Sequence, residues 1–162
     1  NEAAARPLPI TGSYFCDGML KLRLSGSKEG VSSATTELGG LVDSSASGFW
    51  TALVEHQHPY FSSPQPLWRL SVPATTGPLD LPGDSLIEWG GCQRWLRSEL
   101  PAEHIRESVS AAGGHATLFR GGDQSSETFQ PLSPVLHRLH LRLKQAFDPK
   151  GILNPGRLYP EL

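Results

Sequence analysis

Two residues with complementary chemistry flank one short apolar stretch in the second half of the chain. His115 follows a Gly-Gly pair, and Arg120 stands five positions later. A histidine can accept a proton near neutral pH, and an arginine can hold a carboxylate through parallel hydrogen bonds. Together they are candidates for catalysis. The alternative, which the residues alone favour, is a hydrogen-bonded histidine at a strand end and a solvated arginine.

A second candidate site surrounds Gly90-Gly91, where a ligand or another backbone can approach closely. Trp89 and Trp95 flank this pair and share one face if the strand is regular, whereas a bulge would break that parity. Arg94 lies between them and is available to a carboxylate or a phosphate. The alternative is a packed strand with two core tryptophans.

Histidine and cysteine spacing argues against a metal site. The stretch 55–58 contains two histidines, and His137 and His140 stand three positions apart, but neither pair has a third converging ligand. We therefore predict no bound metal. Cys16 and Cys92 are far apart and form no CxxC pair, which favours neither a disulfide scaffold nor a zinc ribbon and indicates a reducing, cytosolic compartment.

The end of the chain is a helix followed by a stiff tail. Residues 144–157 read KQAFDPKGILNPGR, where an Asp-Pro pair ends the helix, the prolines fix φ and the glycines permit sharp bends. This pattern is also that of an ordinary helix exit. Residues 132–162 carry a local net charge of +3. That charge belongs either to a solvated helix face or to a docking surface for another domain or subunit.

The elements that must position these residues follow from hydrophobic periodicity. Alternation predicts strands at 19–24, 67–72 and 115–119. Helical spacing predicts helices at 27–38, 47–57, 101–112 and 132–147. Residues 86–97 are predicted as one long strand with a glycine bulge, which we favour, or as a tight hairpin. Residues 1–17 show little periodicity, so no strand is predicted there.

This order of elements indicates an α+β fold. We expect a ferredoxin-like antiparallel sheet with helices mainly on one face, plus a C-terminal helix and an extended tail. Helices on one side would leave the other sheet face in need of cover. An apolar content of 38% is enough for a core, and the 17 glycines and 14 prolines fit a loop-rich domain.

Charge and hydropathy exclude several partners. The net charge of −2 supplies no positive field, so we predict no nucleic-acid partner. No apolar run approaches the roughly 18 residues that a membrane span needs, and no signal peptide is recognisable. The chain begins with Asn1, and its only methionine is Met19. We therefore expect a fragment or a processed product.

Four stretches resemble the FAD-linked oxidases of the vanillyl-alcohol-oxidase class. The tail AFDPKGILNPGRLY is similar to the C-terminal signature of that class, FDPxGxxNPG. The stretches LIEWGGCQRWL, AAGGHATLFRG and PLPITGSYFCDGMLKLRLSG resemble one branch of the class, the FAD-binding subunit of glycolate oxidases. The similarity extends over nearly the whole chain.

The resemblance implies a division of labour within a longer protein. Residues 1–162 would be the C-terminal cap domain, and the N-terminal flavin-binding domain, which holds most of the FAD, would be absent from this chain. Three tail residues map onto the family signature and are the leading cofactor-binding candidates: Asn154, Pro155 and Gly156. Secondary candidates on the wall facing the flavin are Trp89, Arg94 and Trp95. His115 and Arg120 would suit a small 2-hydroxy acid.

The resemblance also implies a reaction and partners. The intact subunit would oxidise glycolate to glyoxylate with FAD as hydride acceptor, together with a catalytic flavin subunit and an iron–sulfur subunit. It would lie in the cytoplasm, or peripherally at the inner membrane through those subunits. The glycine-rich flavin-binding segments are absent from this sequence. We therefore expect the isolated chain to be inactive and to hold no FAD firmly.

Other functions remain open at this point. The subunit could perform the oxidation itself or only relay electrons. The domain could be a non-catalytic assembly domain that binds partners, or a free-standing ferredoxin-like module that binds a ligand.

Overall fold

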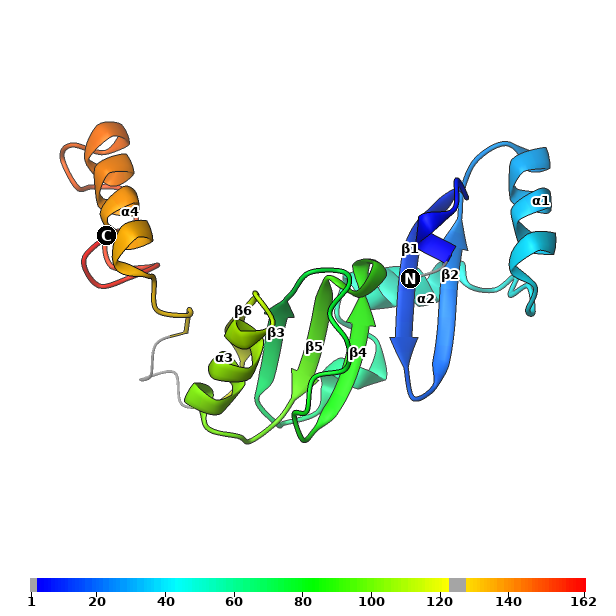
Figure 1. The fold of residues 1–162 in the computed structure, drawn as a ribbon, viewed down its shortest axis with the longest axis horizontal. Coiled ribbons are helices and arrows are strands. Elements are labelled where there is room, and N and C mark those ends of the chain that lie inside the picture. The colour runs from blue at the N-terminus through cyan, green and yellow to red at the C-terminus, as the bar shows by residue number, and fades with distance from the viewer. Residues whose placement is uncertain (1–2, 123–127) are drawn as a thin grey trace. The chain divides into compact units, whose positions relative to one another are not determined.

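The computed structural model describes residues 3–122 and 128–162, and the chain divides into two compact units, Asn1–Gly122 and Asp123–Leu162 (Figure 1). Among the described residues, the first unit contains a six-stranded sheet and three α-helices. The second contains one α-helix and a folded tail.

The first unit begins with a short 3-10 turn, η1 (Ala3–Ala5), and a β-hairpin. β1 (Ile10–Cys16) pairs with β2 (Met19–Leu24). The strand predicted at 19–24 is confirmed, whereas β1 lies where no strand was predicted. The connecting turn is Asp17-Gly18, with φ of 50° and 74°, the left-handed pair that a two-residue type I′ turn requires. The Asp-Gly pair is thus the local signal for β1.

Helical elements follow the hairpin. They are α1 (Lys28–Leu38), α2 (Ser47–Val54) and the 3-10 turn η2 (Pro59–Ser62). α1 begins where the side chain of Ser27 accepts the backbone N–H of Gly30 at 3.1 Å, a side-chain N-cap. The helices predicted at 27–38 and 47–57 are confirmed. The second is shorter than predicted, and His56 lies just beyond it in a left-handed conformation with φ of 54°.

The remaining strands complete one antiparallel sheet. These elements are β3 (Leu67–Ser71), β4 (Asp84–Glu88), β5 (Gln93–Arg97), α3 (Ala102–Ala111) and β6 (His115–Arg120). The strand order is β2-β1-β4-β5-β3-β6, and neighbouring strands pair antiparallel throughout. Strands β4, β5, β3 and β6 follow the order of a split βαβ unit. The predicted α+β class and antiparallel sheet are confirmed.

The favoured prediction of one long bulged strand at 86–97 is wrong, because these residues form a hairpin. β4 pairs directly with β5 across the 3-10 turn η3 (Trp89–Gly91). All three turn residues have positive φ, and such turns reverse the chain instead of bulging it. As a consequence the two tryptophans do not share a face: Trp89 is 71% exposed, and Trp95 is 3% exposed.

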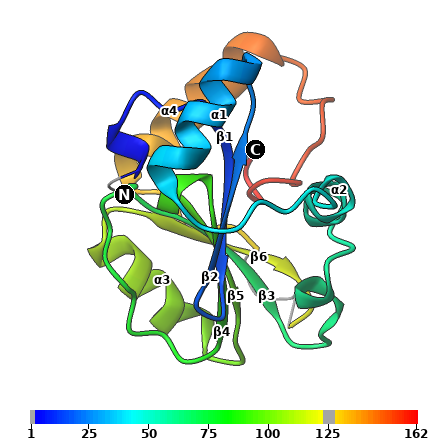
Figure 2. The same ribbon diagram turned by 90° about the vertical axis from the view of Figure 1, so that its right-hand side faces the viewer.

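α3 lies on one side of the sheet and α2 on the other (Figure 2), and a hydrophobic core fills each side. On one face, Tyr14, Leu86 and Trp95 pack with Leu53 of α2 and with Phe61 of η2. On the other face, α3 supplies Ile105 and Val109, both fully buried, against side chains of β3, β5 and β6. Helical elements therefore lie against both faces of the sheet.

The second unit is built on α4 (Pro134–Phe147), which confirms the predicted C-terminal helix. Ser133 caps it by accepting the backbone N–H of Leu136, and Pro134 occupies the first helical turn, where a missing N–H costs nothing. No residue of α4 is buried within the described structure. No helix in the described ranges is long and apolar enough to cross a membrane.

Candidate functional site

The tail after α4 is folded by one buried carboxylate. Asp148 accepts the backbone N–H groups of Ile152 at 3.1 Å and Leu153 at 2.9 Å, and it pairs with Lys144 at 2.8 Å. Lys144 also donates to the carbonyl of Leu153. The bonds to Lys144, Leu153 and Ile152 lower the pKa of Asp148 to about 2. The aspartate of the FDPKG motif therefore both caps the helix and closes the turn after it.

This turn presents the three predicted tail residues outward. Asn154, Pro155 and Gly156 are all exposed. Asn154 has φ of 46°, a left-handed conformation that asparagine tolerates better than most residues. Arg157 donates its backbone N–H to the carbonyl of Asn154 at 3.2 Å. The segment is thus a preformed, exposed loop available to a neighbouring surface.

A polar row crosses the sheet face that packs against α2. Glu88, Gln93, Ser71 and His115 stand directly opposite one another on β4, β5, β3 and β6. Directly paired residues in antiparallel strands point to the same side, so these four share one face. We call them the polar row. Arg69 lies beside the row on β3, opposite Thr117 of β6.

The members of the polar row differ in exposure and in bonding. Glu88 accepts the indole N–H of Trp95 at 2.6 Å and the amide of Gln93 at 3.2 Å, which holds its carboxylate in place. His115 and Arg69 are exposed, and Arg69 has no hydrogen-bond or ion-pair partner among the described residues. The row therefore combines one fixed anion, Glu88, with the exposed His115, and the exposed Arg69 lies beside it.

The two residues singled out on β6 are not brought together. His115 and Arg120 lie at opposite ends of the strand, which at about 3.3 Å per residue places them roughly 17 Å apart. Arg120 donates to the carbonyl of Phe61 at 3.3 Å instead. Closeness in sequence does not bring two side chains together on a strand, because the neighbours of a strand residue stand on adjacent strands.

The histidine near Arg120 is His56. Its ring stacks on Phe61 at 4.2 Å and meets Trp95 and Phe119 edge-on at 4.8 and 5.2 Å. Burial and the positive charge of Arg120 lower the pKa of His56, while Glu88 acts in the opposite direction. His56 is therefore held neutral in an aromatic enclosure beside the polar row. In the sequence, His56 stands out only as a possible metal ligand beside His58.

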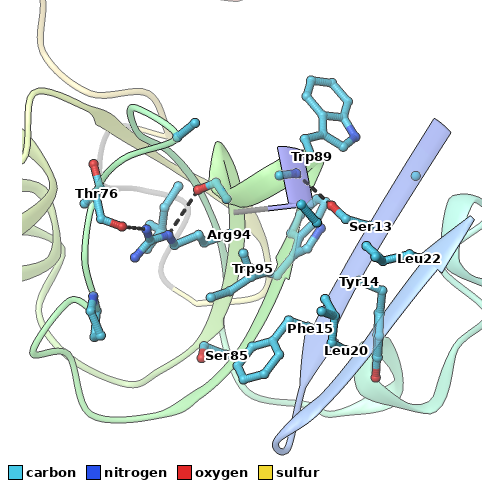
Figure 3. Close-up of a pocket in the computed structure, with 18 of the residues that line it drawn as sticks. Ser13, Tyr14, Phe15, Leu20, Leu22, Thr76, Ser85, Trp89, Arg94 and Trp95 are labelled. Atoms are coloured by element: carbon cyan, nitrogen blue, oxygen red, sulfur yellow. Dashed lines mark hydrogen bonds between the residues drawn. The ribbon is translucent and has the colours of Figure 1, made fainter. Parts of the chain in front are cut away.

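Arg94 lies on the opposite face and is engaged with backbone. Its guanidinium donates to the carbonyls of Gly77 at 2.7 Å, Gly91 at 3.3 Å and Thr76 (Figure 3). Only 6% of the residue is exposed, and burial lowers its pKa. Three of its five donors thus bind the chain itself. Arg94 ties loop 72–83 to the β4–β5 hairpin.

An open groove of about 890 Å³ lies on this second face (Figure 3). Its floor is apolar and includes Phe15, Leu20, Leu22 and Ile87, and Trp89 stands at its rim. Ser13, beside the groove, accepts the backbone N–H of Gly90 at 2.7 Å and fixes the hairpin tip against β1.

The metal candidates do not converge. Within residues 3–122 and 128–162, no three His, Cys, Asp or Glu side chains gather as a metal site would require. His137 lies 3.8 Å from Glu161, and His140 contacts the carbonyl of Leu136 at 2.8 Å.

The described residues do not fit a complete FAD. A glycine-rich loop that opens a helix N-terminus is a common site for a dinucleotide pyrophosphate. In the described residues, Ser27 begins α1, Ala46 α2, Pro101 α3 and Ser133 α4, and none follows such a loop. What they do offer is surface: the exposed tail loop and the polar row.

Comparison with known proteins supports the resemblance. Residues 120–158 match the family of FAD linked oxidases, C-terminal domain. Over 161 residues the chain is 46% identical to the glycolate oxidase subunit GlcE of Escherichia coli (strain K12), which covers 99% of this chain but 45% of that protein. The chain therefore spans less than half the length of this relative. No solved structure matches. The resemblance inferred from the motifs is confirmed.

Proposed function

We infer that this relative of a glycolate oxidase subunit is the C-terminal cap domain of an FAD-linked 2-hydroxy-acid oxidoreductase. The intact protein would oxidise glycolate to glyoxylate, and a separate N-terminal domain would hold most of the FAD. Two surfaces of the chain support this role. They are the polar row with Arg69, and the tail loop at 154–156.

The single observation that carries the proposal is the diagonal placement of Arg69 and His115 on one face of β3 and β6. They stand on adjacent strands, at diagonal positions of the register, which places their backbones roughly 7–8 Å apart on one face. A carboxylate held by Arg69 would bring the neighbouring hydroxyl of a two-carbon acid within reach of His115. Both side chains are exposed on the face that carries the polar row.

Each residue then has a chemical role in the intact flavoprotein. FAD, when bound, supplies the acceptor for hydride. Arg69 binds and orients the substrate carboxylate, and His115 receives the hydroxyl proton. Gln93 and Ser71, which lie between Glu88 and His115 in the row, orient the substrate through hydrogen bonds. Glu88, fixed by Trp95 and Gln93, sets the negative charge at the end of the row.

The tail has a second role. Because Asp148 holds the loop and leaves 154–156 exposed, this loop docks on the flavin domain next to the cofactor. The partners are the protein's own flavin domain, a catalytic flavin subunit and an iron–sulfur subunit. The complex lies in the cytoplasm or peripherally at the inner membrane through those subunits.

A hybrid protein tests the substrate role. This chain replaces the matched residues of E. coli GlcE, and the hybrid is assembled with the other glycolate oxidase subunits. Arg69→Gln should raise KM for glycolate at least tenfold with flavin content unchanged, because the carboxylate loses its charged partner. Lys28→Gln, an exposed cation on α1, is the matched control. An unchanged KM for glycolate in Arg69→Gln would contradict the proposal that Arg69 binds the substrate carboxylate.

A non-catalytic assembly function is the second candidate, and one observation favours it. α4 exposes an apolar stripe, formed by Val135, Leu136, Leu139, Leu143 and Phe147. α4 also carries Arg138, Arg142 and Lys144 and no acidic residue. Changing Arg138 and Arg142 to Glu should abolish subunit assembly while flavin content stays normal if assembly is the main role. Loss of flavin in the same variant would instead support docking of α4 on the flavin domain.

A further inference from the structure

The groove on the second sheet face is apolar and open. Leu20 is 60% exposed, Phe15 42% and Trp89 71%, although all three line one continuous depression. Exposed apolar surface that is contiguous and concave marks a binding surface more often than isolated exposed residues do. This groove lies on the face opposite the polar row and takes no part in the function proposed above.

The groove exists because the fold lacks one helix. A split βαβ unit has two crossovers, and each normally carries a helix onto the sheet. Here the crossover from β5 to β6 carries α3, while the connection from β3 to β4, residues 72–83, contains no helix. α3 covers the half of the face formed by β3, β5 and β6. The half formed by β1, β2 and β4 stays open.

Loop 72–83 cannot close the gap by collapsing into it. The buried Arg94 donates hydrogen bonds to the carbonyls of Thr76 and Gly77 in this loop. Farther along the loop, Leu79 and Leu81 pack against the core that α3 covers. The loop therefore forms a fixed wall, and the vacancy is a preformed feature of the unit.

The charge and size of the groove define its occupant. Its two arginines are already engaged, Arg6 with Glu37 at 3.3 Å and Arg94 with backbone carbonyls. An occupant must therefore present an apolar face. A helix about 10 Å wide, half embedded over three turns, displaces on the order of 600 Å³. That fits within the groove volume of about 890 Å³.

We propose that this groove is the seat of an amphipathic helix from the part of the longer oxidase that this chain does not cover. The proposal rests on the proposed function, because more than half of the relative's length lies outside the match. The helix lays its apolar stripe on Phe15, Leu20 and Leu22 and completes the helical layer beside α3. Domain attachment and substrate contact thus use opposite faces of the sheet.

Co-expression tests this interface. This chain is produced with the unmatched part of E. coli GlcE, and the affinity of the two is measured by titration. Leu20→Glu places a charge on the groove floor at a side chain exposed enough to leave folding intact, and it should weaken binding at least tenfold, about 1.4 kcal/mol. Val54→Glu, 72% exposed on α2, is the matched control and should change affinity less than twofold. Circular dichroism verifies the fold of both variants.

Hydrogen exchange locates the contact independently. Complex formation should slow exchange in β1, β2 and loop 72–83. The groove proposal would be overturned if wild type and Leu20→Glu bound with equal affinity. It would also be overturned if Leu20→Glu and Val54→Glu lost the same amount of affinity. Either result would leave the proposed function standing. Protection confined to α4 and the tail would likewise overturn the groove proposal and leave the proposed function standing. A wild-type homodimer that Leu20→Glu dissociates would assign the groove to a second copy. Failure of the wild-type chain to bind at all would count against both proposals.

Discussion

The two units of the chain treat their apolar side chains in opposite ways. In the first unit, the sheet buries residues on both faces, and Leu86, Ile105 and Val109 are essentially inaccessible. In the second, α4 has a regular apolar stripe, yet none of its residues is buried. Helical periodicity shows which side chains need cover, but it does not say what covers them. The first unit therefore buries a core of its own, whereas α4 leaves its apolar stripe exposed.

The largest expected effect is the loss of unfolding free energy when a buried leucine of the first unit, rather than an exposed leucine of α4, is shortened to alanine. Leu86→Ala should lower the free energy of unfolding by about 2–5 kcal/mol, since it empties a fully buried position. Leu139→Ala in α4 should cost less than about 0.5 kcal/mol in the isolated chain, because its side chain is 49% exposed. Urea unfolding of both variants measures the difference. Equal losses would mean that α4 is buried in solution.

A smaller effect is expected from the tyrosine hydroxyls. Tyr60 donates to the carbonyls of Asp84 at 2.8 Å and Trp95 at 3.0 Å, so Tyr60→Phe should cost about 1–2 kcal/mol. Tyr159→Phe, which removes a hydroxyl bonded to the carbonyl of Gln130 in the second unit, should leave the unfolding midpoint of the first unit unchanged. A shift in that midpoint would show that the two units unfold together.

Acid should weaken the first unit through two partly buried histidines, His56 and His58. Burial lowers the pKa of His56 and His58, so stability is complete above their ordinary value near 6.5 and falls as pH drops below it. His58 accepts the backbone N–H of Tyr60 through Nδ1 at 3.2 Å. His58→Asn keeps a capping acceptor without a titrating group. It should reduce the change in urea midpoint between pH 7.5 and 5. His140→Asn is the control, and an unaltered pH dependence in His58→Asn would contradict the assignment.

The smallest effect is local to the tail. Because the pKa of Asp148 is lowered to about 2, its contribution to the tail is complete above about pH 4 and is lost as pH falls through 2. Asp148→Asn should speed amide exchange at Ile152 and Leu153 at neutral pH, without changing the unfolding midpoint of the first unit. Glu161→Gln is a control for loss of a carboxylate in the same unit. Unchanged amide exchange at Ile152 and Leu153 in Asp148→Asn would contradict the conclusion that Asp148 organises the loop.

The sequence was informative wherever local rules decide the structure. Periodicity located α1, α3, α4 and strands β2, β3 and β6 within a few residues, because these elements depend on neighbours a few positions away. The Asp17-Gly18 turn was equally local and was available as a signal for β1. The FDPKGILNPG motif identified the tail and the family, although the bonds of Asp148 that explain its aspartate emerge only in three dimensions.

The residues by themselves thus determined the class of fold, the terminal helix and the kinship to FAD-linked oxidases. Tertiary structure alone decided which side chains meet. Pairing of β3 with β6 placed Arg69 diagonally across from His115, and the hairpin of β4 and β5 left Trp89 exposed while it buried Trp95. The physical reason is that strand pairing joins residues distant in sequence, and its register depends on the packing of the whole sheet.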